Sequence, residues 1–218
     1  MKKISILGCG WLGNALKEFL EIKEYEVNCL SRDIDKNILE GFYTCNSLII
    51  AIPPSDKYLY FLENVFSFIL PNTQIIFLSS ISFYDNKKSI IEAEKLIKMT
   101  YSSVILRLGG LMGYDRIAGK YTQGKTIENK STNYIHRDDV VNIIISTIEQ
   151  NVKNMIFDVV APIQSTRKQI FLQNSQQFGF KETYFLNELK LEKILSPKIL
   201  CDTLNYKFIK DDVRNFWK

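Results

Sequence analysis

Short apolar runs alternate with longer amphipathic stretches along most of the chain. The apolar runs predict β-strands, because strands that are buried on both faces of a parallel sheet are apolar throughout. We expect strands at residues 4–7, 26–30, 47–52, 74–78, 104–108 and 155–160. The amphipathic stretches repeat apolar residues at helical spacing and predict helices at 11–22, 55–70, 89–99, 138–150 and 166–178. This alternation predicts an α/β fold built around a parallel sheet.

Three segments interrupt the alternation. About fourteen residues, 33–46, separate the second and third expected strands, too few for the helix, strand and second helix that a full doubly wound half contains there. We therefore expect the third strand of the standard sheet to be missing or vestigial, which leaves 26–30 at an edge. Residues 109–135 and 180–218 show little periodicity. We interpret residues 1–160 as one domain with an insertion near 109–135, and residues 161–218 as a small C-terminal lobe packed on it.

A glycine motif lies at the junction between the first strand and the first helix. Gly8, Gly10 and Gly13 form G-x-G-x-x-G immediately after the apolar run. In a dinucleotide-binding fold, the first glycine permits a tight turn, the second lets the backbone approach a pyrophosphate, and the third lets the helix pack closely on the strand. The free N–H groups of the helix N-terminus then face the phosphates. In this context the motif predicts a Rossmann-type sheet that binds a dinucleotide, with a glycine-rich structural turn as the alternative.

The end of the second strand indicates which dinucleotide is bound. An acidic residue normally holds the ribose 2′-hydroxyl of NAD there, whereas this chain has Ser31 followed by Arg32. A hydroxyl and a guanidinium can bind the 2′-phosphate of NADP, so NADP is the expected cofactor. NAD is the alternative, since Asp33 is adjacent. The residues expected to bind the cofactor are Gly8, Gly10, Trp11, Leu12, Gly13, Ser31, Arg32, Ile52, Pro53 and Ser79.

Charge and cysteine content exclude several classes of function. The 28 basic and 24 acidic residues are scattered, without the basic stripe of a nucleic-acid-binding protein. No apolar run reaches the length of a membrane span and the first strand begins at once, so we expect a cytoplasmic protein that binds no membrane. The four cysteines lack metal-ligand spacing and are expected to be reduced, and no metal site is expected. The expected partner is a small-molecule substrate, and the expected assembly is a monomer or homodimer.

Three further motifs follow the glycine motif in order: LSSISFY at 78–84, RLGGLMGYDR at 107–116 and YIHRDDV at 134–140. From about residue 2 to 175, this ordered set resembles the extended short-chain dehydrogenase/reductase family, and in particular its atypical bacterial branch of NAD(P)-dependent epimerase/dehydratase-like proteins. The resemblance implies a Rossmann domain with a small substrate lobe, often acting on nucleotide sugars. It also implies that Ser80 matches a catalytic Ser/Thr position, that 107–116 passes beside the nicotinamide and substrate, and that 134–139 lines the lobe interface.

The chain departs from this family at the catalytic Tyr and Lys. The family places both on the helix after the serine strand, where Tyr transfers a proton and Lys assists it. Tyr84 and Lys88 fit Y-x-x-x-K by letter, but Tyr84 aligns with a structural tyrosine that follows the strand. If Glu94 matches the family's helix glutamate, Asn86 and Ile90 occupy the catalytic positions, so the standard pair is absent. The catalytic candidates are Ser80 and, as a displaced pair, Tyr84 and Lys88. The alternative for Ser80 is that its hydroxyl only caps the turn that follows the strand.

Candidate substrate-binding residues lie in the aperiodic segment and just after it. Arg116 and Lys120 could hold an anionic substrate such as a nucleotide diphosphate, and Tyr134 could stack on a base or sugar. His136 is the only histidine; it could act in the site or simply precede a helix capped by Asp. Arg107, at the end of a strand, is interpreted as an anchor for sheet or loop carbonyls rather than as a substrate ligand.

These observations favour an NAD(P)-binding oxidoreductase or epimerase/dehydratase-like protein that transfers a hydride to or from a small, sugar-like substrate. The first alternative is a catalytically degenerate dinucleotide-binding sensor or scaffold. The second is a reductase of the 6-phosphogluconate or pyrroline-carboxylate type, which would require an all-helical C-terminal domain and is disfavoured by the strand expected at 155–160.

Overall fold

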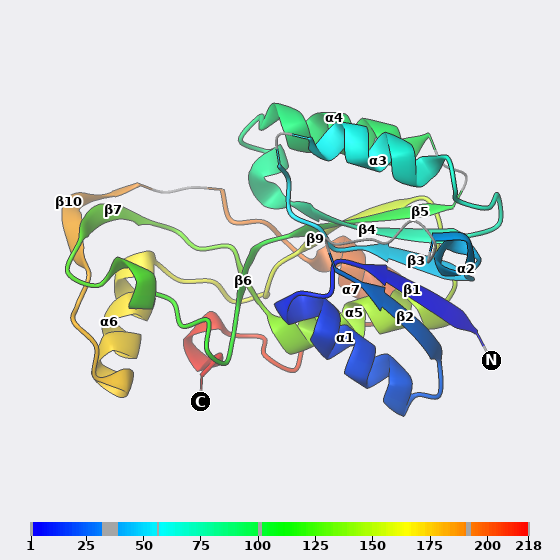
Figure 1. The fold of residues 1–218 in the computed structure, drawn as a ribbon. Coiled ribbons are helices and arrows are strands. Elements are labelled where there is room, and N and C mark those ends of the chain that lie inside the picture. The colour runs from blue at the N-terminus through cyan, green and yellow to red at the C-terminus, as the bar shows by residue number, and fades with distance from the viewer. Residues whose placement is uncertain (1, 32–38, 56, 100–101, 191–192, 218) are drawn as a thin grey trace. The chain divides into compact units, whose positions relative to one another are not determined.

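The computed structural model describes residues 2–31, 39–55, 57–99, 102–190 and 193–217, drawn in Figure 1. Its strands are β1 (Lys3–Leu7), β2 (Glu26–Leu30), β3 (Ser47–Ile50), β4 (Gln74–Ser80), β5 (Ser103–Leu108), β6 (Gly110–Met112), β7 (Thr126–Lys130), β8 (Tyr134–His136), β9 (Met155–Val159) and β10 (Tyr184–Lys190). Its helices are α1 (Trp11–Ile22), α2 (Leu39–Tyr43), α3 (Tyr58–Phe66), α4 (Lys88–Lys98), α5 (Arg137–Glu149), α6 (Arg167–Phe178) and α7 (Lys198–Leu204). Three short 3₁₀ turns are η2 (Ile81–Phe83), η3 (Lys120–Thr122) and η4 (Val213–Asn215).

Six strands form one sheet in the order β2-β1-β3-β4-β5-β9. β1 lies parallel to both β2 and β3, and β3 lies parallel to β4. The predicted Rossmann-type α/β fold is therefore confirmed. In the described part of the chain no strand lies between β2 and β3, and α2 occupies the described end of that segment. β2 is accordingly an edge strand, as the short segment 33–46 predicted.

Contacts between residues divide the chain into two compact units. Unit 1 contains Met1–Arg107 and Val141–Phe157, and unit 2 contains Leu108–Val140 and Asp158–Lys218. In unit 1, α3 and α4 lie on one face of the sheet, and α1 lies with the unit's part of α5 on the other (Figure 1). The division places residues 108–140 with the C-terminal part, whereas the sequence interpretation set a single boundary at residue 160.

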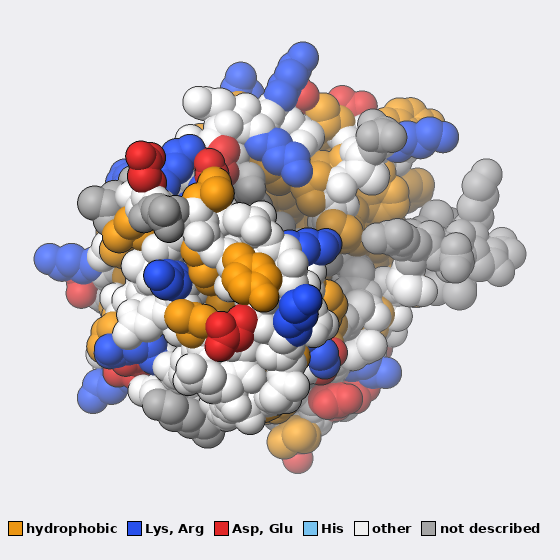
Figure 2. Space-filling view, turned by 90° about the vertical axis from the view of Figure 1, so that its left-hand side faces the viewer, with side chains coloured by type: hydrophobic (Ala, Val, Ile, Leu, Met, Phe, Trp, Pro, Cys, Tyr) orange, Lys and Arg blue, Asp and Glu red, His pale blue; other side chains and the backbone are white. Residues whose placement is uncertain are grey.

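The surface carries its basic groups in a dispersed arrangement on the face drawn in Figure 2. Lysine and arginine side chains lie around this face, between hydrophobic and uncharged ones, and are not collected into one stripe. Among the described helices, none combines the length and apolar composition that crossing a bilayer requires.

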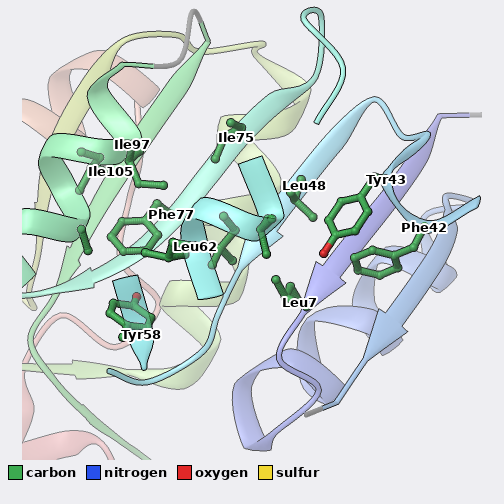
Figure 3. Packing of buried hydrophobic residues seen from close by; sticks show 13 residues of the cluster. Leu7, Phe42, Tyr43, Leu48, Tyr58, Leu62, Ile75, Phe77, Ile97 and Ile105 are labelled. Atoms are coloured by element: carbon green, nitrogen blue, oxygen red, sulfur yellow. The ribbon is translucent and has the colours of Figure 1, made fainter. Parts of the chain in front are cut away.

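The core of unit 1 explains why the apolar runs form buried strands. Leu48, Ile50 and Phe77 of β3 and β4 are fully buried and pack with Leu62 of α3 and Ile97 of α4 (Figure 3). Because both faces of the sheet are covered, the apolar side chains on either side of a strand are removed from water. This burial is the main stabilising contribution to such a sheet. The carboxyl ends of β1, β3 and β4 are thereby fixed side by side.

Unit 2 is built from short strands, helices and loops held by a second core. β6 pairs in parallel with β8, and β7 with β10. Phe171 of α6 and Phe216 pack with four other buried residues, Ala118, Ala161, Ile170 and Val213. The buried carboxylate of Asp139 accepts hydrogen bonds from the Tyr206 hydroxyl (2.8 Å) and from the backbone N–H groups of Ile209 (2.8 Å) and Lys210 (3.0 Å). This carboxylate ties the start of α5 to the C-terminal segment.

Candidate functional site

The glycine loop joins β1 to α1 at the carboxyl edge of the sheet. Gly8 has a φ of +117°, and a Cβ there would lie 2.6 Å from the Ala51 carbonyl oxygen, so only glycine fits. A Cβ at Gly13 would collide with the backbone oxygen of Gly8. Packing therefore explains both glycines: Gly8 packs against the residue that follows β3, and Gly13 packs within the loop.

Gly10 differs from the other two glycines. A Cβ built there meets no atom within 4 Å, and its φ of −86° is accessible to any residue. Gly10 is the N-cap of α1, and no side chain caps the helix. The loop therefore leaves open space at a helix N-terminus whose N-cap residue supplies no side-chain acceptor. Open space at a helix N-terminus is the arrangement that binds phosphate groups. Trp11 and Leu12 begin the first turn of this helix, and both are half-buried.

A cavity of about 250 Å³ lies within unit 1 at the ends of the strands that flank the loop. Its lining includes the predicted residues Ser31, Ile52 and Pro53. The remaining lining residues are Leu7, Pro54, Ser55, Lys57, Tyr58 and Phe61. Burial raises the pKa of Tyr58, whose ring is almost fully enclosed. Ligands of open α/β sheets bind at this edge.

Several of these cavity residues had no signal in the sequence. Lys57, Tyr58 and Phe61 follow the Pro53-Pro54 turn, and helical spacing alone did not separate residues that face the cavity from those in the core. Arg32, which was predicted to bind the cofactor, lies outside the described residues, and so does Asp33.

A buried ionic network lies beside β4. The Arg107 guanidinium donates two hydrogen bonds to the Glu94 carboxylate, 2.9 Å to Oε1 and 2.7 Å to Oε2, and Glu94 is fully buried. The Ser79 hydroxyl donates to the same carboxylate at 2.8 Å. Ser79, predicted to bind cofactor, is thus buried and engaged with Glu94. Arg107 also stacks over Phe83 at 3.5 Å from the ring centroid. It acts as a structural anchor through these side chains, whereas the sequence interpretation expected backbone carbonyls as its partners.

Tyr84 lies at the exposed end of this network. Its hydroxyl accepts a hydrogen bond from Arg107 Nη1 at 3.1 Å, while the residue is 41% exposed. Ser80 ends β4 and caps η2: its hydroxyl oxygen accepts from the Ser82 N–H at 3.2 Å. One short turn therefore carries both the Ser80 and the Tyr84 hydroxyl.

Lys88 lies on the exposed face of α4. Its ammonium lies 3.7 Å from Glu92 on the same helix, and its side chain is 87% exposed. Asn86 adopts a positive φ of 57° in the turn before α4, and Ile90 is buried in that helix. The two positions that would hold the family's catalytic pair are a turn residue and a core residue here.

The predicted substrate residues occupy three kinds of environment in unit 2. Arg116 lines a mostly apolar cavity of about 480 Å³ together with Leu111, Met112, Ile117, Ala118, Gly119, Tyr121, Thr122 and Phe171. Lys120 is exposed and is not part of that lining. Tyr134 is half-buried against the core of unit 2, and burial raises its pKa.

His136 is enclosed rather than exposed to a ligand. It is 3% exposed and lies between Tyr114 and Phe216, with ring centroids 5.5 and 5.4 Å away. The Asp138 N–H donates to its Nδ1 at 3.3 Å. Burial lowers the pKa of His136, and this outweighs the opposing effect of the nearby Asp138 and Asp139 carboxylates. In the described residues no cluster of three His, Cys, Asp or Glu side chains could hold a metal ion.

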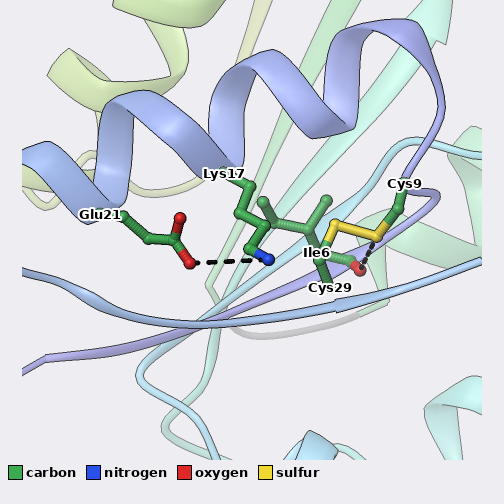
Figure 4. Close-up of a disulfide and its surroundings, with 5 residues drawn as sticks. All are labelled: Ile6, Cys9, Lys17, Glu21 and Cys29. Carbon is green, nitrogen blue, oxygen red and sulfur yellow. Dashed lines mark hydrogen bonds and ion pairs between the residues drawn. A yellow bond between two sulfur atoms is a disulfide. The ribbon is translucent and has the colours of Figure 1, made fainter.

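The prediction that all four cysteines are reduced is wrong for two of them. Cys9 of the glycine loop and Cys29 of β2 form a disulfide, with Cα atoms 5.8 Å apart (Figure 4). The parallel register brings them together, because it pairs Ile6 with Cys29. Their separation of 20 residues has no motif spacing, so the pairing follows only from the neighbouring positions of β1 and β2. Cys45 and Cys201 are free.

Comparison with known proteins shows similarity along nearly the whole chain. No protein-family model matches it. Protein YeeZ of Escherichia coli K12 is 24% identical over an alignment of 263 residues that covers 95% of this chain and 96% of the relative.

Solved structures superpose on most of the chain. A candidate NAD-dependent epimerase/dehydratase of Methylobacillus flagellatus matches with a TM-score of 0.82 and 23% identity, covering 99% of this chain and 96% of the other. The human epimerase family protein SDR39U1, solved with NADPH, matches at 0.78 and 14%, covering 98% and 97%. ADP-L-glycero-D-manno-heptose-6-epimerase of Helicobacter pylori matches at 0.75 and 15%, covering 99% and 93%. The resemblance that the motifs indicated is thus confirmed at the level of the fold: this chain has the fold of the NAD-dependent epimerase/dehydratase and short-chain dehydrogenase/reductase proteins.

Proposed function

We propose that the protein binds a nicotinamide dinucleotide at the glycine loop and acts as an NAD(P)-dependent, epimerase/dehydratase-like oxidoreductase on a small, sugar-like substrate. The observation that carries this proposal is the open space at Gly10, in front of an α1 N-terminus that no side chain caps. The cavity at the ends of β1 and β2 offers Ser31 and Lys57 beside apolar walls, which suits a ribose and a flat base. The comparisons support it, since SDR39U1 was solved with NADPH.

The hydroxyls of Ser80 and Tyr84 are the proposed polar groups of the reaction. When bound, the nicotinamide supplies a hydride acceptor or donor. The Ser80 hydroxyl polarises the reacting oxygen of the substrate, and the Tyr84 hydroxyl gives or takes its proton. Arg107 donates to the Tyr84 oxygen and so stabilises negative charge there, the part that a lysine plays in the wider family. Arg107 is a positioning residue in this scheme, and Lys88 has no part in it.

NADP is the proposed form of the cofactor. Ser31 lies at the cavity, and Arg32 follows it in the sequence. A guanidinium there binds a 2′-phosphate and has nothing comparable to bind in NAD. Arg32→Ala is therefore expected to weaken NADPH binding by about tenfold or more and NADH binding little. Equal losses for the two nucleotides in a calorimetric titration would exclude the 2′-phosphate contact.

The second candidate function is a dinucleotide sensor or scaffold without turnover. Two observations favour it. The positions that the family resemblance assigns to the catalytic pair hold Asn86, in a turn, and Ile90, in the core, and Lys88 is exposed on α4. A reductase with an all-helical C-terminal domain is disfavoured, since unit 2 contains β6, β7, β8 and β10.

A pair of glycine variants tests the cofactor site. Gly10→Ala is expected to fold normally, because its Cβ meets no atom within 4 Å, and to weaken NADPH binding by about tenfold or more, because it fills the space for the pyrophosphate. Gly41→Ala in α2 is the matched control: its Cβ also has open space, and NADPH affinity is expected to stay unchanged. Calorimetry with both variants and the parent protein makes the measurement. An unchanged affinity in Gly10→Ala would reject the site.

Turnover separates the enzyme from the sensor. NADPH oxidation with a panel of keto-sugars is expected for the parent protein, and a loss of about 100-fold or more for Tyr84→Phe. Binding of NADPH without oxidation by any carbonyl substrate of the panel would favour the sensor.

A further inference from the structure

The disulfide lies inside the glycine loop. Cys9 is the residue between Gly8 and Gly10, and Cys29 precedes the last residue of β2. The backbone N–H groups of Gly8 and Cys9 both donate to the Leu30 carbonyl, at 2.8 and 3.2 Å. The first half of the loop is thus attached to β2 by two hydrogen bonds and one covalent bond. Figure 4 shows the sulfur atoms between the start of α1 and the β2 strand.

Gly10, in the second half of the loop, has no side chain to hold it. A Cβ built at Gly10 meets no atom within 4 Å, and as the N-cap of α1 it offers no capping side chain, so this residue adds no side-chain packing to the loop. The stretch from Cys9 to Trp11 presents the N–H groups that the proposed function assigns to the pyrophosphate. A covalent bond at Cys9 therefore restricts the segment whose geometry decides phosphate binding. A restrained loop loses less conformational entropy when a ligand binds, so its affinity is higher.

The chemical position of the pair suits thiol–disulfide exchange. Cys9 and Cys29 are each only half-buried, so a small dithiol can reach the bond. Cys9 lies immediately before the N-cap of α1, and the positive end of a helix stabilises a thiolate. A sulfur that is stabilised as a thiolate is the better leaving group in exchange.

We propose that Cys9 and Cys29 form a redox-active site at which dithiol proteins or small dithiols act, and that the disulfide raises the affinity of the glycine loop for the dinucleotide. In the exchange, a thiolate of the dithiol attacks Cys29, the Cys9–Cys29 bond breaks, and Cys9 leaves as a thiolate. The second thiol of the reductant then attacks the mixed disulfide and releases Cys29. The protein gains two electrons and two protons, the dithiol becomes a disulfide, and the reverse reaction restores the bond. The proposal rests on the proposed dinucleotide-binding function.

The first experiment counts thiols. Alkylation of the oxidised protein, unfolded without reductant and followed by intact mass measurement and peptide mapping, is expected to label two of the four cysteines, Cys45 and Cys201. After dithiothreitol treatment of the folded protein, all four are expected to be labelled. Labelling of Cys9 and Cys29 in the oxidised sample would overturn the proposal.

The second experiment measures NADPH binding by calorimetry to the oxidised protein and to the protein reduced with dithiothreitol. Reduction is expected to weaken binding by at least about threefold. Cys29→Ser is expected to bind as the reduced protein does and to be insensitive to dithiothreitol, whereas Cys201→Ser, which removes a free cysteine, keeps the redox response. Far-ultraviolet circular dichroism of each sample verifies that the fold is intact.

The outcomes separate this proposal from the proposed function. Equal NADPH affinity in both redox states, or tighter binding after reduction, would overturn the redox site and leave the dinucleotide site standing. Absence of NADPH binding in both states would overturn both.

Discussion

Glu94 is a carboxylate that has no contact with solvent, and a single guanidinium balances its charge. Both oxygens are occupied by donors of Arg107, and one also accepts from Ser79. Such a pair costs desolvation energy when it forms, but removing one partner leaves the other charge buried without compensation. The pair also holds Arg107 where it can donate to the Tyr84 hydroxyl.

Glu94→Gln is therefore expected to lower the free energy of unfolding by about 3–5 kcal/mol, because Arg107 would lose its counter-charge in a buried position. Urea denaturation followed by circular dichroism makes the measurement. Glu92→Gln on the same helix is the control, since its partner Lys88 is exposed, and the expected change is below about 1 kcal/mol. Similar small losses in both variants would show that the buried pair contributes no more than an exposed one.

His136 makes stability depend on pH. Burial lowers its pKa below the ordinary value of 6.5, so the unfolded chain takes up a proton at a higher pH than the folded chain does. The neutral imidazole therefore contributes to the free energy of unfolding. This contribution is fully present above about pH 7 and is lost as the pH falls through and below about 6.5, at no more than about 1.4 kcal/mol per pH unit.

His136→Gln is expected to remove this part of the pH dependence. The measurement compares the free energy of unfolding at about pH 8 and about pH 5 for the parent and the variant. The carboxylates change this free energy equally in the two proteins, so the difference between the proteins reports His136. If the two proteins lose the same stability between these values, His136 does not titrate in that interval.

At the scale of elements, α1 lies on β1 as closely as the backbone allows. A side chain at Gly13 would collide with the Gly8 backbone oxygen, and this oxygen cannot move without disturbing the loop. Gly13→Ala is thus expected to lower the free energy of unfolding by about 1–3 kcal/mol or to prevent folding. Gly41→Ala in α2 has open space for its Cβ and is expected to change stability by less than about 1 kcal/mol. Thermal unfolding of the two variants makes the measurement, and similar midpoints for Gly13→Ala and Gly41→Ala would disprove the close contact between Gly13 and the Gly8 oxygen.

The elements of unit 1 were predictable because their signals are local. Strand β1 and helix α1 differ in hydrophobic period, and the glycines mark their junction. The length of 33–46 is too short for a helix, a strand and a second helix, which predicted a missing or vestigial third strand. Helix α3 is shorter than the predicted 55–70 at both ends, since it begins at Tyr58 and ends at Phe66.

The strands of unit 2 could not be predicted in the same way. β6 and β8 have three residues each, too few for a period, and β7 pairs with β10 although Thr126 and Tyr184 lie far apart in the chain. Their stability comes from contacts between distant segments, which single-sequence patterns do not contain. The same reason applies to the site: Ser79 meets Glu94, and Cys9 meets Cys29, only once the sheet is assembled.

At the scale of the whole molecule, the disulfide acts on the unfolded chain as much as on the folded one. It closes a loop whose ends are 20 residues apart and which contains all of α1. A closed loop has fewer conformations when unfolded, and a loop of this length is expected to stabilise the folded state by about 3 kcal/mol.

Dithiothreitol is therefore expected to lower the free energy of unfolding of the parent protein by about 3 kcal/mol in urea denaturation. Cys29→Ser, which has no disulfide to reduce, is expected to unfold identically with and without dithiothreitol, whereas Cys201→Ser responds as the parent does. Because this effect arises in the unfolded chain, it is expected without any dinucleotide present, and the loss of NADPH affinity on reduction is measured separately on folded protein. If the free energy of unfolding of the parent protein is the same with and without dithiothreitol, the bond between the glycine loop and β2 does not restrain the unfolded chain.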